Sequence, residues 1–517
     1  MPAEIELKFV GSPTVLGTAP RSPWLRGLAR GKAKKSMLAS VYFDTPDCKL
    51  RRHGLALRIR KVGRTRLQTI KQEGNGAGNV FVRDEWEKEI GADRPDFALA
   101  KDTPLPDLLS RKAADSIRPV FETVVERTRI PLHIGTSEIE VAIDRGWIRC
   151  GNRRQRIGEI ELELKQGGMA ELATLAARLA ESLPVSFEVR SKAERGYALD
   201  SGEWGKPIRG GDIHLDSAGK AADAFRIIGF SCLHHLAANR EAVCNGEPDG
   251  VHQMRIGARR LRAAISAFKE MLASPETEGI KIELKWITDQ LAPARDFHVL
   301  LDEVLLPLRD KQPNEPGVEL LIADVEHRRA EGFKAAKTTL RSERYRKAIL
   351  RTALWLAAGE WSRSEDPLVQ AWREHPIQEF GREVLSHRAE KIVKKGRKLS
   401  GLDHAHRHKL RIAVKKLRYS AEFFSSLFSG SKAKKERKRF ESVLKALQNA
   451  LGKLNDIAVH ETLAAELASD AERAKERPQE AYAMGLVIGR EQRKAAACVA
   501  AAKKAVKKLS GADPFWH

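Results

Sequence analysis

The sequence has little cysteine, and its cysteines form no pairing pattern. Five occur in 517 residues without a CxxC pair, at Cys48, Cys150, Cys232, Cys244 and Cys498. This scarcity argues against a disulfide framework or a thiolate zinc site and indicates a reducing cytoplasm. The first residues, MPAEIELKFV, lack the basic and apolar regions of a signal peptide. No uncharged apolar run reaches the roughly 18 residues that span a membrane.

Aromatic residues are also scarce, at 6% of the chain, whereas basic residues are abundant. The formal net charge of +23 indicates a polyanionic partner such as nucleic acid, an anionic membrane or polyphosphate. Nucleic acid is disfavoured, because few aromatic side chains are available to stack on bases and no recognition motif appears. The basic excess is uneven. Residues 1–205 carry 35 Lys and Arg against 28 Asp and Glu, and residues 206–517 carry 57 against 41.

The length predicts at least two domains, since a single hydrophobic core stops growing at roughly 250–300 residues. Near residue 205 the apolar residues change from period two to helical spacing. We therefore predict an α+β multidomain protein, with a strand-rich domain followed by a helical one. The predicted divisions are the first domain at 1–203, a Gly-rich linker at 204–216 and the helical domain at 217–508, whose two repeats span about 217–308 and 318–508 around a Pro-rich break.

About eight strands separated by turn residues are predicted in the first domain, with helices near 105–117 and 169–183. The predicted strands are EIELKFV, LALRIRKV, RLQTIKQE, VFVRDEWEKEI, TRIPLHI, EIEVAID, GWIRCG and GEIELELK. Many antiparallel strands with no unpaired edge favour an eight-stranded barrel. The region at 10–40 is predicted to hold a short helix near 22–30 and a solvated run of lysines.

The charged residues of these strands share one face. In the first strand Glu4, Glu6 and Lys8 alternate with apolar residues, and the strand at 158–165 repeats the pattern. One interpretation is an open sheet with a solvated face. The other is a barrel with a charged lumen, which is favoured because acids and bases are sorted by strand and the apolar outer face needs a cover.

The helical half contains an internal repeat. HQMRIGARRLRAAISAF, from His252, matches HKLRIAVKKLRYSAEFF, from His408, and the segments downstream align Asp296 with Asp456. On a helix each copy places a histidine and several bases on one stripe. The stripes are His252, Arg255, Arg259 and Arg262 flanked by Arg260, and His408, Arg411, Lys415 and Arg418 flanked by Lys416. Such a stripe is electrostatically costly unless an anion lies along it. The alternative is a solvated face paired with acids such as Asp296 and Asp456.

The first half resembles the CYTH family, the triphosphate tunnel metalloenzymes. The signature ExExK occurs as Glu4, Glu6 and Lys8, and the segments YFDTPDCKLRRHGLALRIR, TIK, VRDEWE and SKAERGYAL match further elements of that family. The resemblance covers nearly all of 1–202. It implies an antiparallel tunnel that hydrolyses a triphosphate with Mg²⁺ or Mn²⁺. The same fold also serves adenylate cyclases, thiamine triphosphatases and RNA triphosphatases.

The resemblance also implies roles for the charged residues. Basic side chains would neutralise the triphosphate, and carboxylates would hold a divalent cation, which prefers oxygen ligands. The implied catalytic residues are Glu4, Glu6, Lys8, Arg58, Arg60, Lys71, Arg83 and Arg127. The substrate-binding set is Lys8, Arg58, Arg60, Lys71, Arg83, Glu85, Arg127 and Lys192. The metal ligands are Glu4, Glu6, Asp144, Glu159, Glu161 and Glu163, with the first two on one wall and the last three on the facing wall.

The second half resembles the CHAD domain over about 217–508, through the paired HxxR…RRLR and HxxR…KKLR units. That resemblance implies binding of inorganic polyphosphate along the two stripes, in the cytoplasm or at polyphosphate granules. The whole sequence thus predicts an inorganic triphosphatase that releases phosphate from triphosphate and carries a polyphosphate-binding module. The alternatives are an adenylate cyclase or another enzyme of nucleotide or organic triphosphates, and a polyphosphate-binding scaffold without catalysis.

Overall fold

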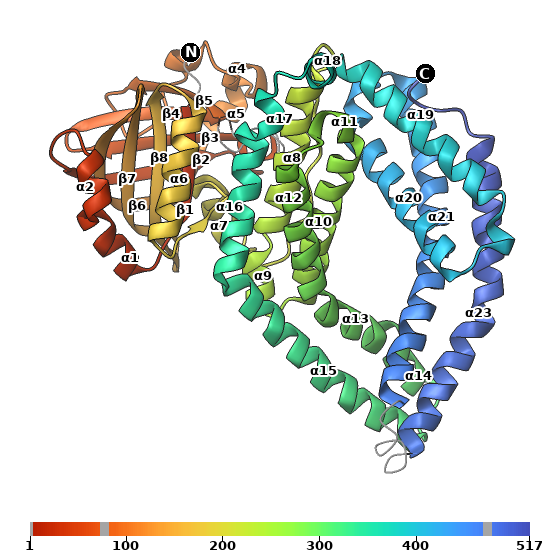
Figure 1. Ribbon diagram of the computed structural model, residues 1–517. Coiled ribbons are helices and arrows are strands. Elements are labelled where there is room, and N and C mark those ends of the chain that lie inside the picture. Colours follow the sequence, from red (N-terminus) through yellow and green to blue (C-terminus); the bar gives the residue numbers. More distant parts are fainter. Residues whose placement is uncertain (1–3, 73–81, 469–477) are drawn as a thin grey trace.

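The computed structural model describes residues 4–72, 82–468 and 478–517 (Figure 1). A strand-rich part precedes an all-helical part, which confirms the predicted fold class. The strands are β1 (Glu4–Val10), β2 (Lys34–Asp44), β3 (Leu55–Val62), β4 (Thr65–Gln72), β5 (Val82–Glu89), β6 (Arg118–Ile134), β7 (Ser137–Cys150), β8 (Arg153–Gln166) and β9 (Ser186–Phe187). The helices among them are α1 (Pro13–Thr18), α2 (Pro23–Leu28), α3 (Lys49–Arg52), α4 (Leu105–Leu108), α5 (Arg111–Asp115), α6 (Met169–Ser182) and α7 (Lys192–Asp200).

The strands form one antiparallel sheet that curls until its ends meet. Its order is β5-β4-β3-β2-β6-β7-β8-β1-β9. One edge of β1 pairs with β8, and the other edge meets β5 at its first two residues and β9 at its last two. The predicted barrel is therefore corrected in one respect. The join between β1 and β5 spans only two residue pairs, so the sheet is not closed along its whole length.

The alternation of polar and apolar residues decides which face of the sheet lies inside. Leu7 and Phe9 of β1 and Leu162 of β8 are buried on the outer face, in a core that includes Leu175 of α6. Their charged neighbours in sequence consequently point to the inner face, since successive side chains alternate along a strand. This cover on the outer face favours the charged lumen over the open, solvated sheet.

Two differences from the predicted strands have physical reasons. β2 was not predicted, because it starts on exposed lysines and ends in residues buried on both faces, so it lacks a clean alternation. EIEVAID and GWIRCG, predicted as separate strands, form the single strand β7, and Gly146 at the start of the second segment does not interrupt it. That glycine instead lies against β6, where a Cβ would come within 1.9 Å of the Val124 carbonyl oxygen.

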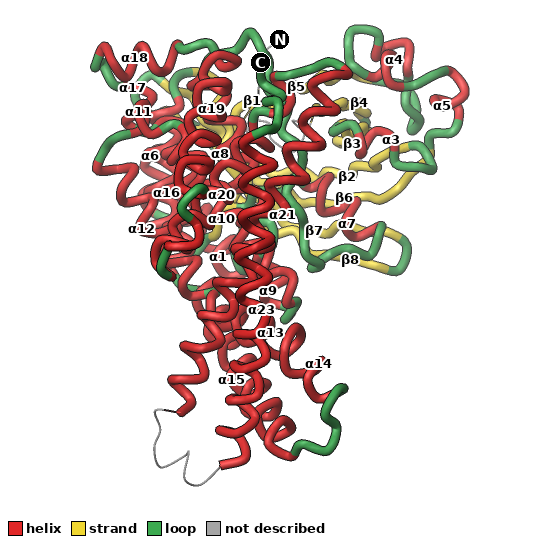
Figure 2. Tube along the Cα trace, turned by 90° about the vertical axis from the view of Figure 1, so that its right-hand side faces the viewer, coloured by secondary structure: helices red, strands yellow, loops and turns green. Residues whose placement is uncertain are grey.

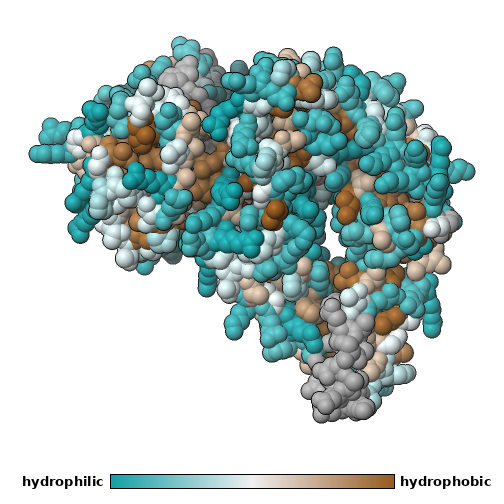
Figure 3. Space-filling model, viewed as in Figure 1, coloured by the Kyte–Doolittle hydropathy of each residue, from teal (hydrophilic) through white to brown (hydrophobic). Residues whose placement is uncertain are grey.

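The helical domain consists of two bundles. α8, α10, α12 and α16 lie beside the sheet domain, whereas α19, α20, α21 and α23 form the second bundle (Figure 1). The described helices of the whole helical domain are α8 (Ala221–Ala237), α9 (Arg240–Cys244), α10 (Pro248–Ala267), α11 (Lys269–Leu272), α12 (Pro275–Gln290), α13 (Ala292–Leu300), α14 (Leu306–Arg309), α15 (Pro316–Arg341), α16 (Glu343–Ala358), α17 (Glu360–Arg363), α18 (Pro367–Glu374), α19 (Ile377–Gly396), α20 (His404–Phe423), α21 (Ser431–Ala468) and α23 (Pro478–Ser510). The repeated segments become α10 and α20, which contact each other. The long α15, α21 and α23 converge away from the sheet (Figure 2), and the surface is hollowed between the two bundles (Figure 3).

The segment between the two domains is packed against the helical domain. Ile213 and Leu215 are buried, and the Asn239 side chain of α8's C-terminal turn exchanges two hydrogen bonds of 2.8 Å with the backbone of Ile208. One hydrophobic core continues from the sheet into the helical bundles. Among the helices of the described residues, none has the length and apolar character that membrane crossing needs.

Candidate active site and basic cluster

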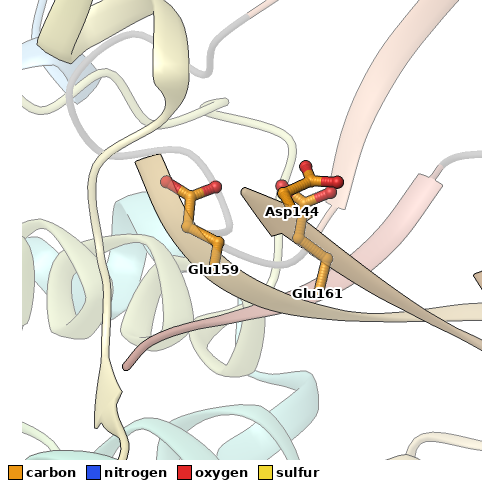
Figure 4. Close-up of side chains that lie close together, drawn as sticks. All are labelled: Asp144, Glu159 and Glu161. Atoms are coloured by element: carbon orange, nitrogen blue, oxygen red, sulfur yellow. The ribbon is translucent and has the colours of Figure 1, made fainter. Parts of the chain in front are cut away.

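Three buried carboxylates meet on the inner face of the sheet. Asp144 of β7 pairs directly with Glu159 of β8, and Glu161 follows two residues along the same strand (Figure 4). One oxygen of each carboxylate lies within 4.8 Å of the other two. Asp144 and Glu159 are fully buried, and Glu161 is 6% exposed. We call these three residues the acidic cluster.

Basic side chains neutralise the acidic cluster from two directions. Lys192, the first residue of α7, places Nζ 2.9 Å from Asp144 Oδ2 and 2.5 Å from Glu161 Oε1. The same ammonium lies 2.6 Å from Glu159 Oε2. From β6, Arg127 donates hydrogen bonds of 2.7 Å from Nε and from Nη2 to the two oxygens of Asp144. It also bonds Glu161. These are charge-assisted hydrogen bonds, the strong class in proteins.

These ion pairs keep both the carboxylates and the basic side chains ionised. Burial alone would raise the pKa of Glu161, but Lys192 and Arg127 hold it well below its usual value. Burial opposes the charge of Lys192, yet the carboxylates raise its pKa above the usual value. Arg195 of α7 bonds Glu159, while burial lowers the pKa of that arginine to about 10. Three acids therefore face three bases, and the acidic cluster is electrically balanced.

Glu6 and Lys8 extend the acidic cluster from β1. Because β1 lies directly beside β8, Glu6 pairs with Glu163 and Lys8 with Glu161. The prediction placed Glu4 and Glu6 on one wall and Glu159, Glu161 and Glu163 on the facing wall. It is wrong, because β1 and β8 are adjacent antiparallel strands and form one continuous wall. Lys8 Nζ lies 3.4 Å from Glu6 Oε1 and 3.8 Å from Glu161 Oε1. In the part of the chain that the structure describes, the buried Glu6 Oε1 accepts no hydrogen bond.

A more positive group lies on β3 and β4. Arg58 Nη2 and Lys71 Nζ share the carboxylate of Glu85, at 3.3 and 2.9 Å. Arg60 lies beside them, and burial together with Arg58 and Arg127 lowers its pKa to about 10. Buried guanidinium groups that repel one another are stabilised by an anion between them. This group is therefore suited to bind phosphate oxygens.

Sequence reasoning missed Tyr42 and left Arg195 out of the site. Tyr42 of β2 is 3% exposed and stacks on Phe121 with ring centroids 4.4 Å apart. Burial raises the pKa of its phenol, but Arg58 lowers it to below the usual value. Because β2 was not predicted, its inward face could not be assigned. For Arg195 a signal was present, since it follows Lys192 by three residues and so shares its helix face.

Three further predicted site residues lie toward the ends of their strands. Glu163 bonds Lys165 at the end of β8, where both side chains are partly exposed. The side chains of Glu4 and Arg83 lie outside the described residues, although their backbones pair across β1 and β5.

The acidic cluster has the donor chemistry of a divalent cation site. Carboxylate oxygens are the ligands that Mg²⁺ and Mn²⁺ prefer, and Asp144, Glu159 and Glu161 supply them within reach of one ion. Glu6 lies near enough to raise the pKa of Lys192, and its unbonded oxygen offers a further ligand. A cation adds positive charge to a balanced group, so its binding favours an accompanying anion or a displaced Lys192.

In the helical domain the two stripes converge. Arg255 and Arg259 of α10 lie within electrostatic range of Arg411 and Lys415 of α20, since Arg259 lowers the pKa of the other three. Burial, followed by Arg411 and Arg259, lowers the pKa of Lys415 to about 7. We call these four residues the basic cluster.

Asp296 and Asp456, the acids that the repeat aligns, lie near the basic cluster but do not neutralise all of its charge. Arg255 Nη1 lies 3.5 Å from Asp296 Oδ1, and Asp456 opposes the lowered pKa of Arg411 and Lys415. Burial raises the pKa of Asp296 despite Arg255. The alternative of a face paired with acids is thus met only in part.

The remaining stripe residues are placed differently. Arg260 is buried between the two bundles, where it bonds Glu422 of α20 at 2.6 Å and His235 of α8 at 3.2 Å. Arg262 is exposed, whereas burial, followed by Arg295, lowers the pKa of His252 to about 4. The contacts of the others are Lys416 Nζ to Ser266 Oγ at 2.9 Å, Arg418 Nη1 to Gln448 Oε1 at 3.0 Å and His408 Nδ1 to Asn455 Oδ1 at 2.8 Å.

Comparison with known families agrees with this division. Residues 2–197 match the model of the CYTH domain, and residues 228–465 match the model of the CHAD domain. The chain therefore contains a CYTH domain followed by a CHAD domain.

Each individual relative matches only one of the two parts of the chain, either the sheet domain or the helical domain. An inorganic triphosphatase of Haemophilus influenzae is 30% identical over 204 residues, which are 38% of this chain and 55% of that protein. The crystal structure of the CHAD domain from the plant Ricinus communis is 29% identical, with a TM-score of 0.49 over 58% of this chain and 96% of that one. A putative adenylyl cyclase from Hippeastrum, described as having a dominant triphosphatase activity, is 18% identical, with a TM-score of 0.28 over 39% of this chain and 96% of that one.

Proposed function

We propose that the sheet domain hydrolyses inorganic triphosphate to diphosphate and phosphate with Mg²⁺ or Mn²⁺. The observation that carries this proposal is the juxtaposition, on one inner face, of the acidic cluster and the positive group around Arg60. A triphosphate bears about four or five negative charges, and its cleavage requires their neutralisation and an aligned water. The CYTH match and the triphosphatase relative support the same substrate class.

Each side chain has a task in this proposal. Arg58, Arg60 and Lys71 bind the phosphate oxygens, for which the guanidinium fork is well shaped. Lys8, between Glu6 and Glu161, supplies a further positive charge for the phosphate chain. The cation, held by the acidic cluster and Glu6, neutralises charge on the phosphate chain when bound. Glu6 Oε1, which accepts no hydrogen bond among the described residues, is the proposed cation ligand from β1.

The helical domain, in the same proposal, binds inorganic polyphosphate along the basic cluster. Four buried or half-buried bases on two facing helices exceed the acids beside them, which suits a long linear polyanion. A cytoplasmic location, in contact with polyphosphate granules, would follow from this partner.

Phosphate release from a substrate panel tests the enzymatic proposal. Full-length protein with Mg²⁺ or Mn²⁺ is given triphosphate, ATP, thiamine triphosphate and long-chain polyphosphate, and we expect triphosphate to be cleaved fastest. Glu6→Ala should abolish that turnover, because it removes a proposed ligand of the cation. Preference for ATP would instead identify a nucleotide enzyme, and binding of triphosphate without release would identify a scaffold. Competition between polyphosphate and DNA at one salt concentration tests the partner of the helical domain.

A further inference from the structure

The first turn of α7 faces two domains at once. Lys192 and Arg195 lie on one side of it, three residues apart, and both bond the acidic cluster. Glu194 is about 200° around the helix from Lys192, so it points to the opposite side. There it meets α8 of the helical domain, where His234 Nε2 lies 3.0 Å from Glu194 Oε1.

The contact with His234 is joined to the start of α7. Ser191 caps the helix, and its side chain accepts a 2.9 Å hydrogen bond from the Glu194 backbone N–H. In return Glu194 Oε2 accepts a 2.7 Å hydrogen bond from the Ser191 backbone N–H. One carboxylate therefore uses one oxygen to fix the residue before Lys192 and the other to bind the helical domain. Burial disfavours the charged imidazole, but Glu194 raises the pKa of His234 above its usual value.

The rest of α7 is held by the sheet. Tyr197 donates a 2.9 Å hydrogen bond to the buried Asp44 Oδ2. Gly196 lies so close to Phe121 that a Cβ would come within 2.1 Å of its ring. The first turn of α7 is thus held from two sides, by the acidic cluster of the sheet and by His234 of the helical domain.

We propose that His234 is a positioning residue, through which the helical domain fixes the first turn of α7 and thereby holds Lys192 inside the acidic cluster. This inference rests on the proposed cation site. The ammonium of Lys192 and a divalent cation are attracted to the same carboxylate oxygens, so a firmly held Lys192 weakens binding of the cation alone. The helical domain would then set the cation affinity of the acidic cluster through α7.

Titration of full-length protein with Mn²⁺, followed by the electron paramagnetic resonance signal of the free ion, tests this without any turnover. Lys192→Met should tighten Mn²⁺ binding about tenfold, because it removes the competing charge. His234→Ala should tighten it about threefold, because the first turn loosens. His234→Gln, whose amide can still donate to Glu194, should behave like the unsubstituted protein. The matched control is His327→Ala, which removes an exposed pair of histidine and Glu331 within α15.

The double variant H234A/K192M decides the mechanism. If His234 acts through Lys192, the histidine substitution has no further effect once the lysine is gone. An undiminished effect in that background, an equal effect of His327→Ala, or no effect of His234→Ala would each overturn the inference. Absence of Mn²⁺ binding to the unsubstituted protein would overturn the cation site as well, whereas intact Mn²⁺ effects without triphosphate cleavage would overturn only the proposed hydrolysis.

Discussion

Two half-buried lysines in this protein have opposite environments. Lys192, in the sheet domain, contacts three carboxylates, and its pKa lies above the usual value although burial opposes its charge. Lys415, in the helical domain, is flanked by Arg411 and Arg259, and burial and these neighbours lower its pKa to about 7. The first lysine belongs to a balanced group, and the second to a group with too few acids.

Under the proposed function, the difference corresponds to two ways of binding a phosphate chain. A balanced group of acids and bases is stable without ligand and can exchange partners when a cation and an anion arrive together. An unbalanced group of bases repels itself until a polyanion neutralises it. This contrast suits a catalytic centre in the sheet domain and a binding surface in the helical domain.

The balanced group should be the more sensitive to loss of one member. Glu161→Gln removes a proposed cation ligand and leaves Lys192 and Arg127 under-neutralised. We expect triphosphate turnover to fall by about a thousandfold or more, measured as phosphate release at saturating Mn²⁺. Glu181→Gln, on the exposed side of α6, is the control and should retain activity.

Thermal unfolding must accompany this measurement, because removing one partner of a buried ion pair costs about 3–5 kcal/mol. Turnover within tenfold of the unsubstituted protein, in a folded variant, would contradict the assignment of the acidic cluster.

Each arginine of the basic cluster should contribute separately to polyphosphate affinity. We expect about tenfold, or about 1.4 kcal/mol, for each one. Replacing Arg259 and Arg411 together by alanine should therefore weaken polyphosphate binding about a hundredfold. Fluorescence anisotropy with a labelled chain, at one salt concentration, measures this. Lys285→Ala, which removes an exposed lysine paired with Asp289 on α12, is the matched control. Equal losses in both variants would show that the partner senses only net charge.

How much of this contrast the sequence predicted depends on how local each feature is. The strand alternation placed Glu161 and Arg58 on one face, and the repeat placed Arg259 and Arg411 on equivalent helix positions, because both follow from short periodicities. That β1 adjoins β8 could not be inferred, since strand order is a long-range property. The inward position of Arg260 also escaped prediction, because its partner Glu422 belongs to the other repeat.

The balance of the acidic cluster predicts that cation and substrate bind together. A non-hydrolysable triphosphate analogue should tighten Mn²⁺ binding at least tenfold, because it offsets the charge that the cation adds to a neutral group. Calorimetric titration of Mn²⁺ with and without the analogue measures the coupling, and Lys192→Met should reduce it. Equal Mn²⁺ affinities in both titrations would show that the acidic cluster accepts a cation without help from substrate.

The imbalance around Lys415 predicts a pH dependence that the acidic cluster lacks. With a pKa of about 7, this lysine is about half charged at neutral pH in the free protein, and a bound polyanion raises its pKa. The protonated form therefore binds more tightly, and affinity for polyphosphate should fall by up to about tenfold as the pH rises from about 7 to about 9. The charged neighbours that face Lys415 are Arg411, Arg259, Arg255 and Asp456. Lys415→Arg should bind with nearly constant affinity, and a pH dependence that survives this substitution would assign the proton to another group.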